Sequence, residues 1–214
     1  MKVHLLWNHL REITNMKKLL IYGAGGNGKV CADIAKKSGY ENIVFYDDNK
    51  NINSLDEYEV IHSLDNISED EYDFFNAIGD NKTRELLTNK LNKNMATLIH
   101  PTAVIGENVT IDEGSVIMAK AVINPGCKIG KGVIINTCSS LDHDDVINDF
   151  SHISINSHLA GTVVLGKRVF VGMSSTIINN VDICDDVIIG AGATVVDSIE
   201  KVGTYVGVPA KLIK

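Results

Sequence analysis

A histidine among three aspartates forms the densest cluster of titratable side chains in the second half of the chain, in the order Asp142-His143-Asp144-Asp145. A carboxylate bonded to one ring nitrogen of a histidine fixes its tautomer and raises the pKa of the other nitrogen from about 6.5, which suits a general base. Two other interpretations stay open from these residues alone. The histidine could be a solvated surface residue among solvated aspartates. It could also belong to a metal site, which we disfavour because one histidine with hard carboxylates lacks the ligand set of a typical zinc site.

A glycine-rich turn near the start of the chain offers a second chemical function. The sequence 23–28, GAGGNG, separates a buried-strand pattern over 17–22 from a helix pattern that ends at Gly39, and Asp47 and Asp48 follow the next strand pattern. Bare glycine backbone and a helix N-terminus hold phosphate, while a carboxylate about 20 residues on takes ribose hydroxyls. The pattern predicts a nucleotide pyrophosphate site and does not by itself indicate nicotinamide. The alternatives are an NAD site, or glycines that only form a tight turn between strand and helix.

The histidine cluster lies within a long repeat that must position it. An aliphatic residue recurs every six positions from Ile105 to Val195 without a slip in register. Four positions later the residue is small or apolar in every repeat except the one that holds Asp145. A helix repeats at 3.6 residues and a strand at 2, so a strict period of six predicts a hexapeptide β-solenoid. We expect aliphatic side chains along the axis, with Gly (Gly106 and Gly172, for example) and Asn or Asp supplying left-handed backbone at the corners.

If three hexads form one coil, residues eighteen apart stack at strand spacing, about 4.8 Å. The stacked pairs of interest are Gly161 on His143 and Ala191 on Met173. A glycine above the histidine would expose a backbone N–H where the oxyanion of an acyl-transfer intermediate would lie beside the base. His152 and His158 occupy equivalent positions on neighbouring faces. We interpret His152 as a candidate ligand contact and His158 as a corner residue.

The chain divides at His100-Pro101 into a small domain and the prism. We predict an N-terminal extension over residues 1–15, a Rossmann-like α/β half domain over 16–99 and a left-handed parallel β-helix over 100–214. Strands near Val60 and over 72–78, a helix over 82–91 and a closing strand over 96–99 complete the half domain, which is too short for a full dinucleotide fold. After Val195 the chain leaves the repeat and should cap the last coil, because an open solenoid end exposes strand edges.

Composition narrows the class of protein. A net charge of -7 argues against nucleic acid or an anionic membrane as the main partner. The four cysteines show no CxxC spacing, and Cys127 falls on an inward small position, so we interpret it as a small buried hydrophobe. No apolar run approaches the ~20 residues that a membrane helix needs. We expect a cytoplasmic protein without membrane insertion and without a bound metal.

Several longer stretches resemble a known enzyme family. Spread over residues 17–214, they read YGAGGNGKVCADIA, YDFFNAIGDN, INPGCKIGKGVIINT, SSLDHDDVI, FSHISI, LAGTVVLG and YVGVPAK. Together they resemble the bacterial sugar acyltransferases of the sialic-acid O-acetyltransferase type, and most closely the UDP-4-amino-sugar N-acetyltransferases of bacillosamine biosynthesis. The resemblance implies a left-handed β-helix, a homotrimer and acetyl-CoA bound in the groove between neighbouring prisms.

The resemblance also implies roles for individual residues. His143 matches the family's general base and Asp144 its carboxylate partner, where close relatives carry Glu, so that Asp142 or Asp145 could take over that role. The positions that match acetyl-CoA contacts are His152, Gly161, Met173 and Ala191. The positions that match nucleotide-sugar contacts are Gly25, Gly26, Asn27, Asp47, Asp48 and Gly79, with Asn27 in place of a histidine that is common in relatives.

These implications lead to one expected function and several alternatives. We expect an acetyl group to move from acetyl-CoA to the C4 amine of a UDP-linked 4-amino-4,6-dideoxy sugar. The transfer should be direct, because no cysteine or serine has an activating partner that the sequence identifies. The alternatives are O-acetylation of sialic acid, N-acetylation of a dTDP- or GDP-linked amino sugar, and a non-catalytic solenoid that binds a nucleotide.

Overall fold

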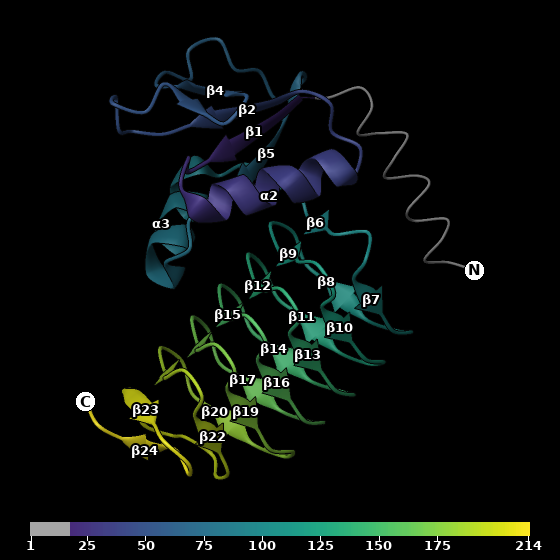
Figure 1. Cartoon of the computed structure of the whole chain (residues 1–214), viewed down its shortest axis with the longest axis vertical. Coiled ribbons are helices and arrows are strands. Elements are labelled where there is room, and N and C mark those ends of the chain that lie inside the picture. Colours follow the sequence, from purple (N-terminus) through teal and green to yellow (C-terminus); the bar gives the residue numbers. More distant parts are fainter. Residues whose placement is uncertain (1–17) are drawn as a thin grey trace.

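The computed structural model describes residues 18–214, so the predicted extension over residues 1–15 lies outside the described residues. A small α/β domain lies at one end of a three-sided prism, and the C-terminal strands lie at the other end (Figure 1). The predicted fold class, an α/β half domain followed by a parallel β-helix of hexapeptide repeats, is confirmed. None of the helices in the described part of the chain is long and apolar enough to cross a membrane.

The small domain is a five-stranded sheet between two helices. Its strand order is β3-β4-β2-β1-β5, and all the pairs are parallel except β3 with β4. Leu19 and Ile21 pack with α2, whereas Leu20 and Tyr22 face the other side, where α3 packs. The strands are β1 (Lys18–Tyr22), β2 (Ile43–Tyr46), β3 (Ser54–Leu55), β4 (Tyr58–Ile61) and β5 (Tyr72–Asn76), and the helices are α2 (Gly26–Lys37) and α3 (Asn81–Leu91).

The residues before the prism correct one prediction. We expected residues 96–99 to close the small sheet, but of residues 95–99 only Met95 and Ala96 pair with its backbone, through a bridge and a 2.7 Å hydrogen bond to Phe74. Leu98–Ile99 (β6) instead pairs with β9 and begins the first face of the prism. The physical reason lies in the repeat itself, because Leu98 stands eighteen residues before Val116 and is therefore already in the coil register.

Each face of the prism is a ladder of two-residue parallel strands. The face that includes β6 continues through β9 (Val116–Ile117), β12 (Ile134–Ile135), β15 (His152–Ile153), β18 (Phe170–Val171) and β21 (Ile188–Ile189). The six-stranded face comprises β7 (Val104–Ile105), β10 (Val122–Ile123), β13 (Ser140–Leu141), β16 (His158–Leu159), β19 (Thr176–Ile177) and β22 (Thr194–Val195). The five-stranded face comprises β8 (Thr110–Ile111), β11 (Lys128–Ile129), β14 (Val146–Ile147), β17 (Val164–Leu165) and β20 (Asp182–Ile183).

The recurring aliphatic residues are the second residues of β7 to β22, and their side chains fill the prism axis as predicted. Beyond β22 the chain closes the open end. Ile199 bridges Ile183, β23 (Thr204–Val206) pairs with β21, and β24 (Lys211–Leu212) turns back antiparallel onto β23. These strands lie where the sequence analysis predicts a C-terminal cap.

The faces meet at three columns of corner residues with positive φ. The first corner joins the six-stranded and five-stranded faces, and its members are Asn108, Gly126, Asp144, Thr162 and Asn180. The second corner joins the five-stranded face to the β6–β21 face, and its members are Gly114, Gly132, Phe150, Arg168 and Asp186. The third corner joins the β6–β21 face to the six-stranded face, and its members are Lys120, Cys138, Asn156, Ser174 and Gly192.

The corner residues correct part of our prediction about glycine. Gly, Asn and Asp supply left-handed backbone as expected, but so do larger residues such as Phe150 and Arg168. The glycines that directly follow the aliphatic residues are not left-handed. They allow close approach of the next coil instead: a Cβ on Gly106 would lie 2.6 Å from Pro125 N, and one on Gly172 would lie 2.6 Å from Ala191 N.

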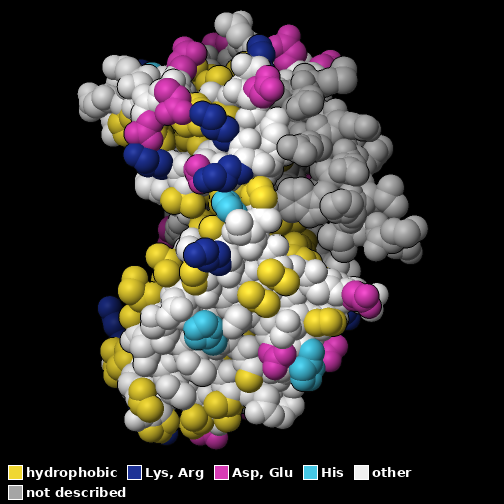
Figure 2. All heavy atoms as spheres, turned by 45° about the vertical axis from the view of Figure 1, so that its right-hand side comes forward, with side chains coloured by type: hydrophobic (Ala, Val, Ile, Leu, Met, Phe, Trp, Pro, Cys, Tyr) yellow, Lys and Arg dark blue, Asp and Glu magenta, His cyan; other side chains and the backbone are white. Residues whose placement is uncertain are grey.

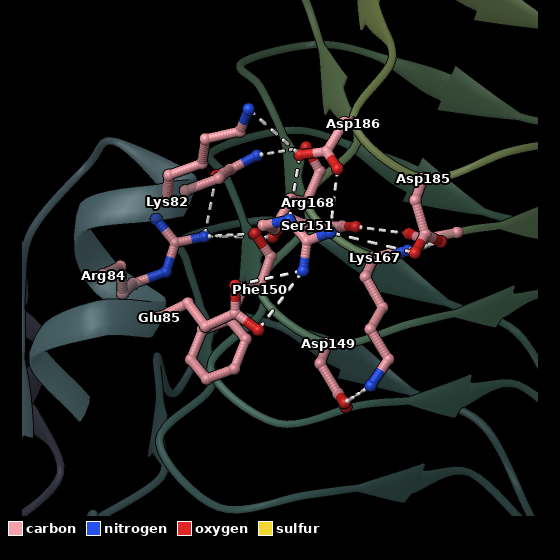
Figure 3. A network of polar contacts seen from close by, with 12 residues as sticks. Lys82, Arg84, Glu85, Asp149, Phe150, Ser151, Lys167, Arg168, Asp185 and Asp186 are labelled. Atoms are coloured by element: carbon pink, nitrogen blue, oxygen red, sulfur yellow. Dashed lines mark hydrogen bonds and ion pairs between the residues drawn. The ribbon is translucent and has the colours of Figure 1, made fainter. Parts of the chain in front are cut away.

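The small domain is fastened to the second corner by α3 (Figure 3). Arg84, 1% exposed, donates from Nε to Gly132 O at 2.8 Å and from Nη2 to Phe150 O at 2.8 Å. Its Nη1 donates to Ile78 O and Gly79 O at 3.0 Å each. Since every direction of the guanidinium finds an acceptor, this buried cation joins the β5–α3 loop and the prism at one point.

A second set of contacts extends this junction along the corner. Arg168 forms a bidentate pair with Asp186 and also contacts Glu85 of α3 at 3.0 Å. On the other side of the domain, α2 lies between the sheet and the prism (Figure 1), where Ser38 Oγ donates to Ile99 O at 3.0 Å. The loops at the carboxyl ends of the small sheet are therefore held in a defined position over the prism.

Candidate active site

His143 lies on the first corner, between β13 and β14. Its Nδ1 is 2.9 Å from Asp144 Oδ2, and its backbone N–H donates to Asp142 Oδ1 at 2.8 Å. The hydrogen bond to the Asp144 carboxylate is the main cause that raises the pKa of His143 above its ordinary value. Because the carboxylate occupies Nδ1, the neutral ring carries its proton there and leaves Nε2 as a basic atom. The side chain is 59% exposed, so Nε2 is accessible to a reactant.

The three aspartates have different positions. Asp144 contacts the ring, and Asp142 holds the backbone of His143 while it also accepts from Asn124 Nδ2 at 2.9 Å. Asp145 points into the prism and is fully buried. Its Oδ1 accepts from Val163 N at 2.8 Å, and burial raises the pKa of its carboxyl to about 7. Asp144 is thus the carboxylate that contacts the imidazole.

Gly161 stacks on His143, as the eighteen-residue spacing predicts. A Cβ built on Gly161 would lie 2.6 Å from His143 Nε2, so only glycine leaves room for the ring in this position. The next residue, Thr162, donates its N–H to His143 O at 2.9 Å. No acceptor for the Gly161 N–H is found among residues 18–214. The basic ring nitrogen therefore packs against Gly161, whose backbone N–H has no partner among these residues.

Met173 and Ala191 also stack as predicted, but on the third corner, with Met173 52% exposed and its carbonyl accepting from Gly192 N at 2.9 Å. The six-stranded face separates them from His143 and Gly161. A space-filling view shows a histidine beside acidic side chains on the prism surface, and a hollow between the prism and the small domain (Figure 2).

His152 and His158 have different surroundings, although they occupy equivalent positions on neighbouring faces. His152 packs edge-on against Phe170 at 5.2 Å, its Nδ1 is buried without a partner, and Asn136 Nδ2 lies 3.1 Å from its Nε2. Burial and the nearby Arg84 charge lower its pKa to about 4, although the backbone of Gly79 beside it opposes the shift. His158 is not a corner residue: it lies in β16, exposed, and bonds Ser140 Oγ at 2.8 Å.

The glycine turn of the small domain meets the three requirements of a phosphate-binding turn: a tight turn, close packing of the helix on the strand, and open backbone for the ligand. Gly23 adopts a φ of +99°, and a Cβ on Gly28 would lie 2.1 Å from Gly23 O. Gly25 and Gly26 have no atom within 4 Å of an added Cβ, so their backbone borders open space. Gly25 caps α2 without any side-chain hydrogen bond. The first N–H groups of the helix are thus available to an anion.

The other predicted residues of the small domain surround this turn. Asn27 Nδ2 donates to Ala77 O at 3.0 Å. Asp47 Oδ2 accepts from Ala24 N in the turn at 2.9 Å, while Asp48 accepts from Tyr46 Oη at 2.7 Å. Gly79 borders open space and is the residue whose carbonyl accepts from Arg84. Asp47 therefore supports the turn directly, and the turn and Gly79 lie at the same edge of the sheet.

The sequence predicts no role for two residues near the site. Arg84, which anchors the loop around Gly79, has no sequence signal beyond its place on a polar helix. His62 has its Nδ1 2.7 Å from Asp47 O and its Nε2 buried without a partner, and no motif marks it. Among the described residues no group of three or more His, Cys, Asp or Glu is arranged to hold a metal ion. The metal-free site stays a prediction.

Known proteins match both parts of the chain. Residues 18–91 match the family model of the PglD N-terminal domain, and residues 162–197 match the model of the bacterial transferase hexapeptide. Over 166 residues the chain is 29% identical to a serine acetyltransferase of Buchnera aphidicola subsp. Schizaphis graminum, which covers 77% of this chain and 54% of that protein. Over 104 residues it is 34% identical to a UDP-3-O-acylglucosamine N-acyltransferase of Bordetella avium, which covers 49% of this chain and 27% of that protein. The chain thus spans about half the length of the first and about a quarter of the second.

Solved structures match nearly the whole chain. The acetyltransferase domain of PglB from Neisseria gonorrhoeae FA1090 is 36% identical, with a TM-score of 0.88 over 92% of this chain and 100% of that one. A mutant of perosamine N-acetyltransferase from Caulobacter crescentus, in complex with CoA and GDP-perosamine, is 31% identical, with a TM-score of 0.88 over 93% of this chain and 98% of that one. With this identity across a complete acetyltransferase domain, and with a PglD N-terminal domain ahead of the hexapeptide prism, the chain belongs to the PglD-type acetyltransferase family.

Proposed function

We propose that this acetyltransferase moves the acetyl group of acetyl-CoA to the C4 amine of a UDP-linked 4-amino-4,6-dideoxy sugar. The observation that carries the proposal is the basic Nε2 of His143, held by Asp144 and packed against Gly161, whose N–H has no acceptor among residues 18–214. A protonated amine does not attack a thioester, so the reaction needs a base near neutral pKa beside the acyl carbonyl. It also needs a donor for the oxyanion that forms.

The residues of the site perform a direct transfer. His143 Nε2 takes a proton from the amine as the sugar nitrogen bonds to the thioester carbonyl carbon. The Gly161 N–H donates to the carbonyl oxygen as negative charge develops there. When the carbon–sulfur bond breaks, the imidazolium returns the proton to the leaving thiolate. Asp144 stabilises the imidazolium between these two steps.

Three of the four cysteines support a mechanism without an acetylated enzyme, and the exposed Cys138 has no activating partner among the described residues. Burial raises the pKa of Cys31 to about 12 and that of Cys127 to about 11, and it also raises the pKa of Cys184. A cysteine nucleophile requires a lowered pKa, so these thiols are poor candidates. No acetylated enzyme should accumulate, and intact-protein mass spectrometry after quenched turnover tests this directly.

For the nucleotide sugar, we assign the pyrophosphate to the open backbone at Gly25 and Gly26. Asn27 and Gly79 would border it at the same edge of the sheet, and Asp47 and Asp48 would accept from the ribose and the base. A GDP-linked 4-amino sugar is the second candidate, since the perosamine N-acetyltransferase complex holds GDP-perosamine. The exposed carboxylate of Asp48 would favour a ring N–H donor, which uracil and guanine both carry.

We further propose a homotrimer in which acetyl-CoA lies between neighbouring prisms. Gly161 and the pair Met173 and Ala191 lie on different corners of one prism, so a second copy that places its third corner against the first corner would unite them. His152 lies in β15 of the β6–β21 face, beside the backbone of Gly79. A contact between His152 and acetyl-CoA would therefore involve the loop that carries Gly79. Light scattering should give three copies per particle, and a fully active monomer would refute this arrangement.

One experiment tests the activity and the acceptor together. Purified enzyme is given acetyl-CoA with UDP-, dTDP- and GDP-linked 4-amino sugars or with sialic acid, and thiol release gives kcat/KM for each. We expect His143→Ala to lower kcat by roughly 10²–10⁴-fold, whereas Lys128→Ala, on the exposed surface of the five-stranded face, should retain the wild-type rate. A tenfold preference for sialic acid over every amino sugar, about 1.4 kcal/mol of discrimination, would contradict the N-acetyltransferase assignment.

A further inference from the structure

The interior of the prism repeats one side-chain hydrogen bond along its corners. At five of the six small positions that carry a hydroxyl or thiol, the side chain donates to the carbonyl fifteen residues later in the chain, whereas Ser139 donates to Asn136 O at 2.6 Å instead. The donors and acceptors are Ser115 to Gly130 O (2.7 Å), Cys127 to Asp142 O (2.9 Å), Ser151 to Gly166 O (2.8 Å), Ser157 to Gly172 O (2.7 Å) and Ser175 to Gly190 O (2.9 Å). In two of these cases the oxygen also accepts from the N–H eighteen residues later, from Val133 to Ser115 Oγ and from Val169 to Ser151 Oγ.

Asp145 occupies the same small position and reproduces half of this pattern. Its Oδ1 accepts from Val163 N, eighteen residues later, at 2.8 Å. Its Oδ2 is buried and has no partner. The carbonyl fifteen residues later is that of Ala160, and no donor to it is found within residues 18–214. A buried carboxylate oxygen without a donor is costly, and the repeat places the Ala160 carbonyl where a proton on Asp145 would reach it, as the Cys127 thiol reaches Asp142 O. A single proton on Oδ2 satisfies both atoms.

We propose that Asp145 is a positioning residue for acetyl transfer, and that in its protonated form it donates from Oδ2 to Ala160 O and thereby holds and polarises the Ala160–Gly161 peptide. This inference rests on the proposed function, since the N–H of that same peptide is the one assigned to the oxyanion beside His143. Hydrogen bonds in a chain strengthen one another, because a carbonyl that accepts a bond makes its own peptide N–H a better donor. Asp145 would thus act on the reacting group through one peptide unit.

The protonation of Asp145 is set by its surroundings. On its own turn the nearby titratable groups are Asp142 and His143, and in the coil below it faces the Cys127 thiol. In the coil above, Val163 is apolar. Burial, with the Asp142 charge, raises the pKa of the carboxyl to about 7, while His143 and the nearby backbone oppose the shift. The group therefore changes charge close to the pH at which the enzyme would work.

The consequence is an alkaline limit on catalysis that comes from the core of the prism. As pH rises, loss of the Asp145 proton removes the donor to Ala160 O and adds a buried negative charge near the developing oxyanion. The rate should therefore fall above about pH 7 to 8. Stability should fall at lower pH than the rate: because the folded-state pKa is raised, the stabilising contribution is full below about pH 4, is lost progressively as pH rises to about 7, and changes no further above that.

Three variants test the inference. Asp145→Asn always offers an N–H to Ala160 O and an oxygen to Val163 N. It should keep kcat/KM within about threefold, lose the alkaline decline in rate, and lose the decline in Tm that the wild type shows between about pH 4 and 7. Asp145→Val matches the residue that already occupies this position one coil above. It should be about tenfold slower at every pH, less than the 10²–10³ that loss of an oxyanion donor costs. Asp145→Ser introduces the residue that Ser151 provides at the small position of the next hexad, and it should restore the wild-type rate. This variant replaces the valine variant in the test if the valine variant does not fold.

The outcomes separate this inference from the proposed function. An asparagine variant whose rate and Tm decline with pH in parallel with the wild type would overturn the role of Asp145, as would a valine variant with full rate. If no acceptor is acetylated, or if His143→Ala is fully active, the proposed function fails instead. The pH dependence of Tm in the wild type and the asparagine variant still decides whether Asp145 carries the proton in the folded chain.

Discussion

Replacing Arg84 by methionine should uncouple the small domain from the prism. Methionine matches the length of the aliphatic stem, so the change leaves little cavity and chiefly removes the guanidinium. That group donates to Gly132 O and Phe150 O across the junction, and to Ile78 O, Gly79 O and Asn81 Oδ1 within the small domain. Burial lowers the pKa of Arg84 to about 10, so the group is still charged at neutral pH and donates charge-assisted bonds.

The magnitude follows from these bonds. Each hydrogen bond to a charged group contributes about 1.5–3 kcal/mol, but the cost of burying the cation offsets much of the sum, and breaking a buried charged network costs about 3–5 kcal/mol. We expect Arg84→Met to lower the free energy of unfolding by about 3 kcal/mol, at the lower end of that range because methionine also relieves the desolvation of the cation.

Urea unfolding followed by circular dichroism and by tyrosine fluorescence measures both the loss of stability and the uncoupling of the small domain from the prism. In the wild type the two transitions should coincide, and in the variant the small domain, which carries most of the tyrosines, should unfold first. Lys82→Met is the matched control, because this side chain on the same helix is 70% exposed and its pair with Asp186 lies at the surface. The control should change stability by less than about 1 kcal/mol. An Arg84→Met effect as small as the control, with coincident transitions, would refute the docking role.

Three further predictions concern the candidate site. Gly161→Ala places a methyl group 2.6 Å from His143 Nε2, so we expect an unchanged Tm with kcat/KM lowered by roughly 10²-fold or more, as when catalytic geometry is displaced; a variant near full rate would exclude this packing. Asp144→Asn, at a corner φ of +62° that asparagine tolerates, removes the main cause of the raised His143 pKa, so the acid limb of the pH–kcat/KM profile should move to lower pH, and an unmoved limb would contradict the pairing. Gly25→Ala should keep Tm but weaken nucleotide-sugar binding in titration calorimetry, whereas Gly28→Ala, with a Cβ 2.1 Å from a carbonyl oxygen, should lower Tm. A Gly25→Ala variant with lowered Tm and unchanged binding would contradict the assignment of the open glycines to the ligand.

The sequence by itself determined the prism and the core of the histidine site. A period of six specifies which residues point inward, and each inward residue contacts copies of its own position eighteen residues away, so the contacts follow from counting. His143 and Asp144 are neighbours in the chain on one corner, and Gly161 follows from the same spacing. The glycine turn was also predictable, because its strand, turn and helix are consecutive in the chain.

Tertiary structure alone decided how the parts combine. The small domain contacts the prism through Arg84, which lies outside the repeat, so the period does not reveal that its partners are Gly132 and Phe150 on successive coils of the second corner. Tertiary structure also placed Leu98–Ile99 in the prism and not in the small sheet. It buried Nδ1 of the His152 ring and put Met173 on a different corner from His143. Above all, it turned Asp145 into the core and left one oxygen without a partner. The spacing predicts that the residue points inward, but only the packing of the coils shows that a proton is needed there.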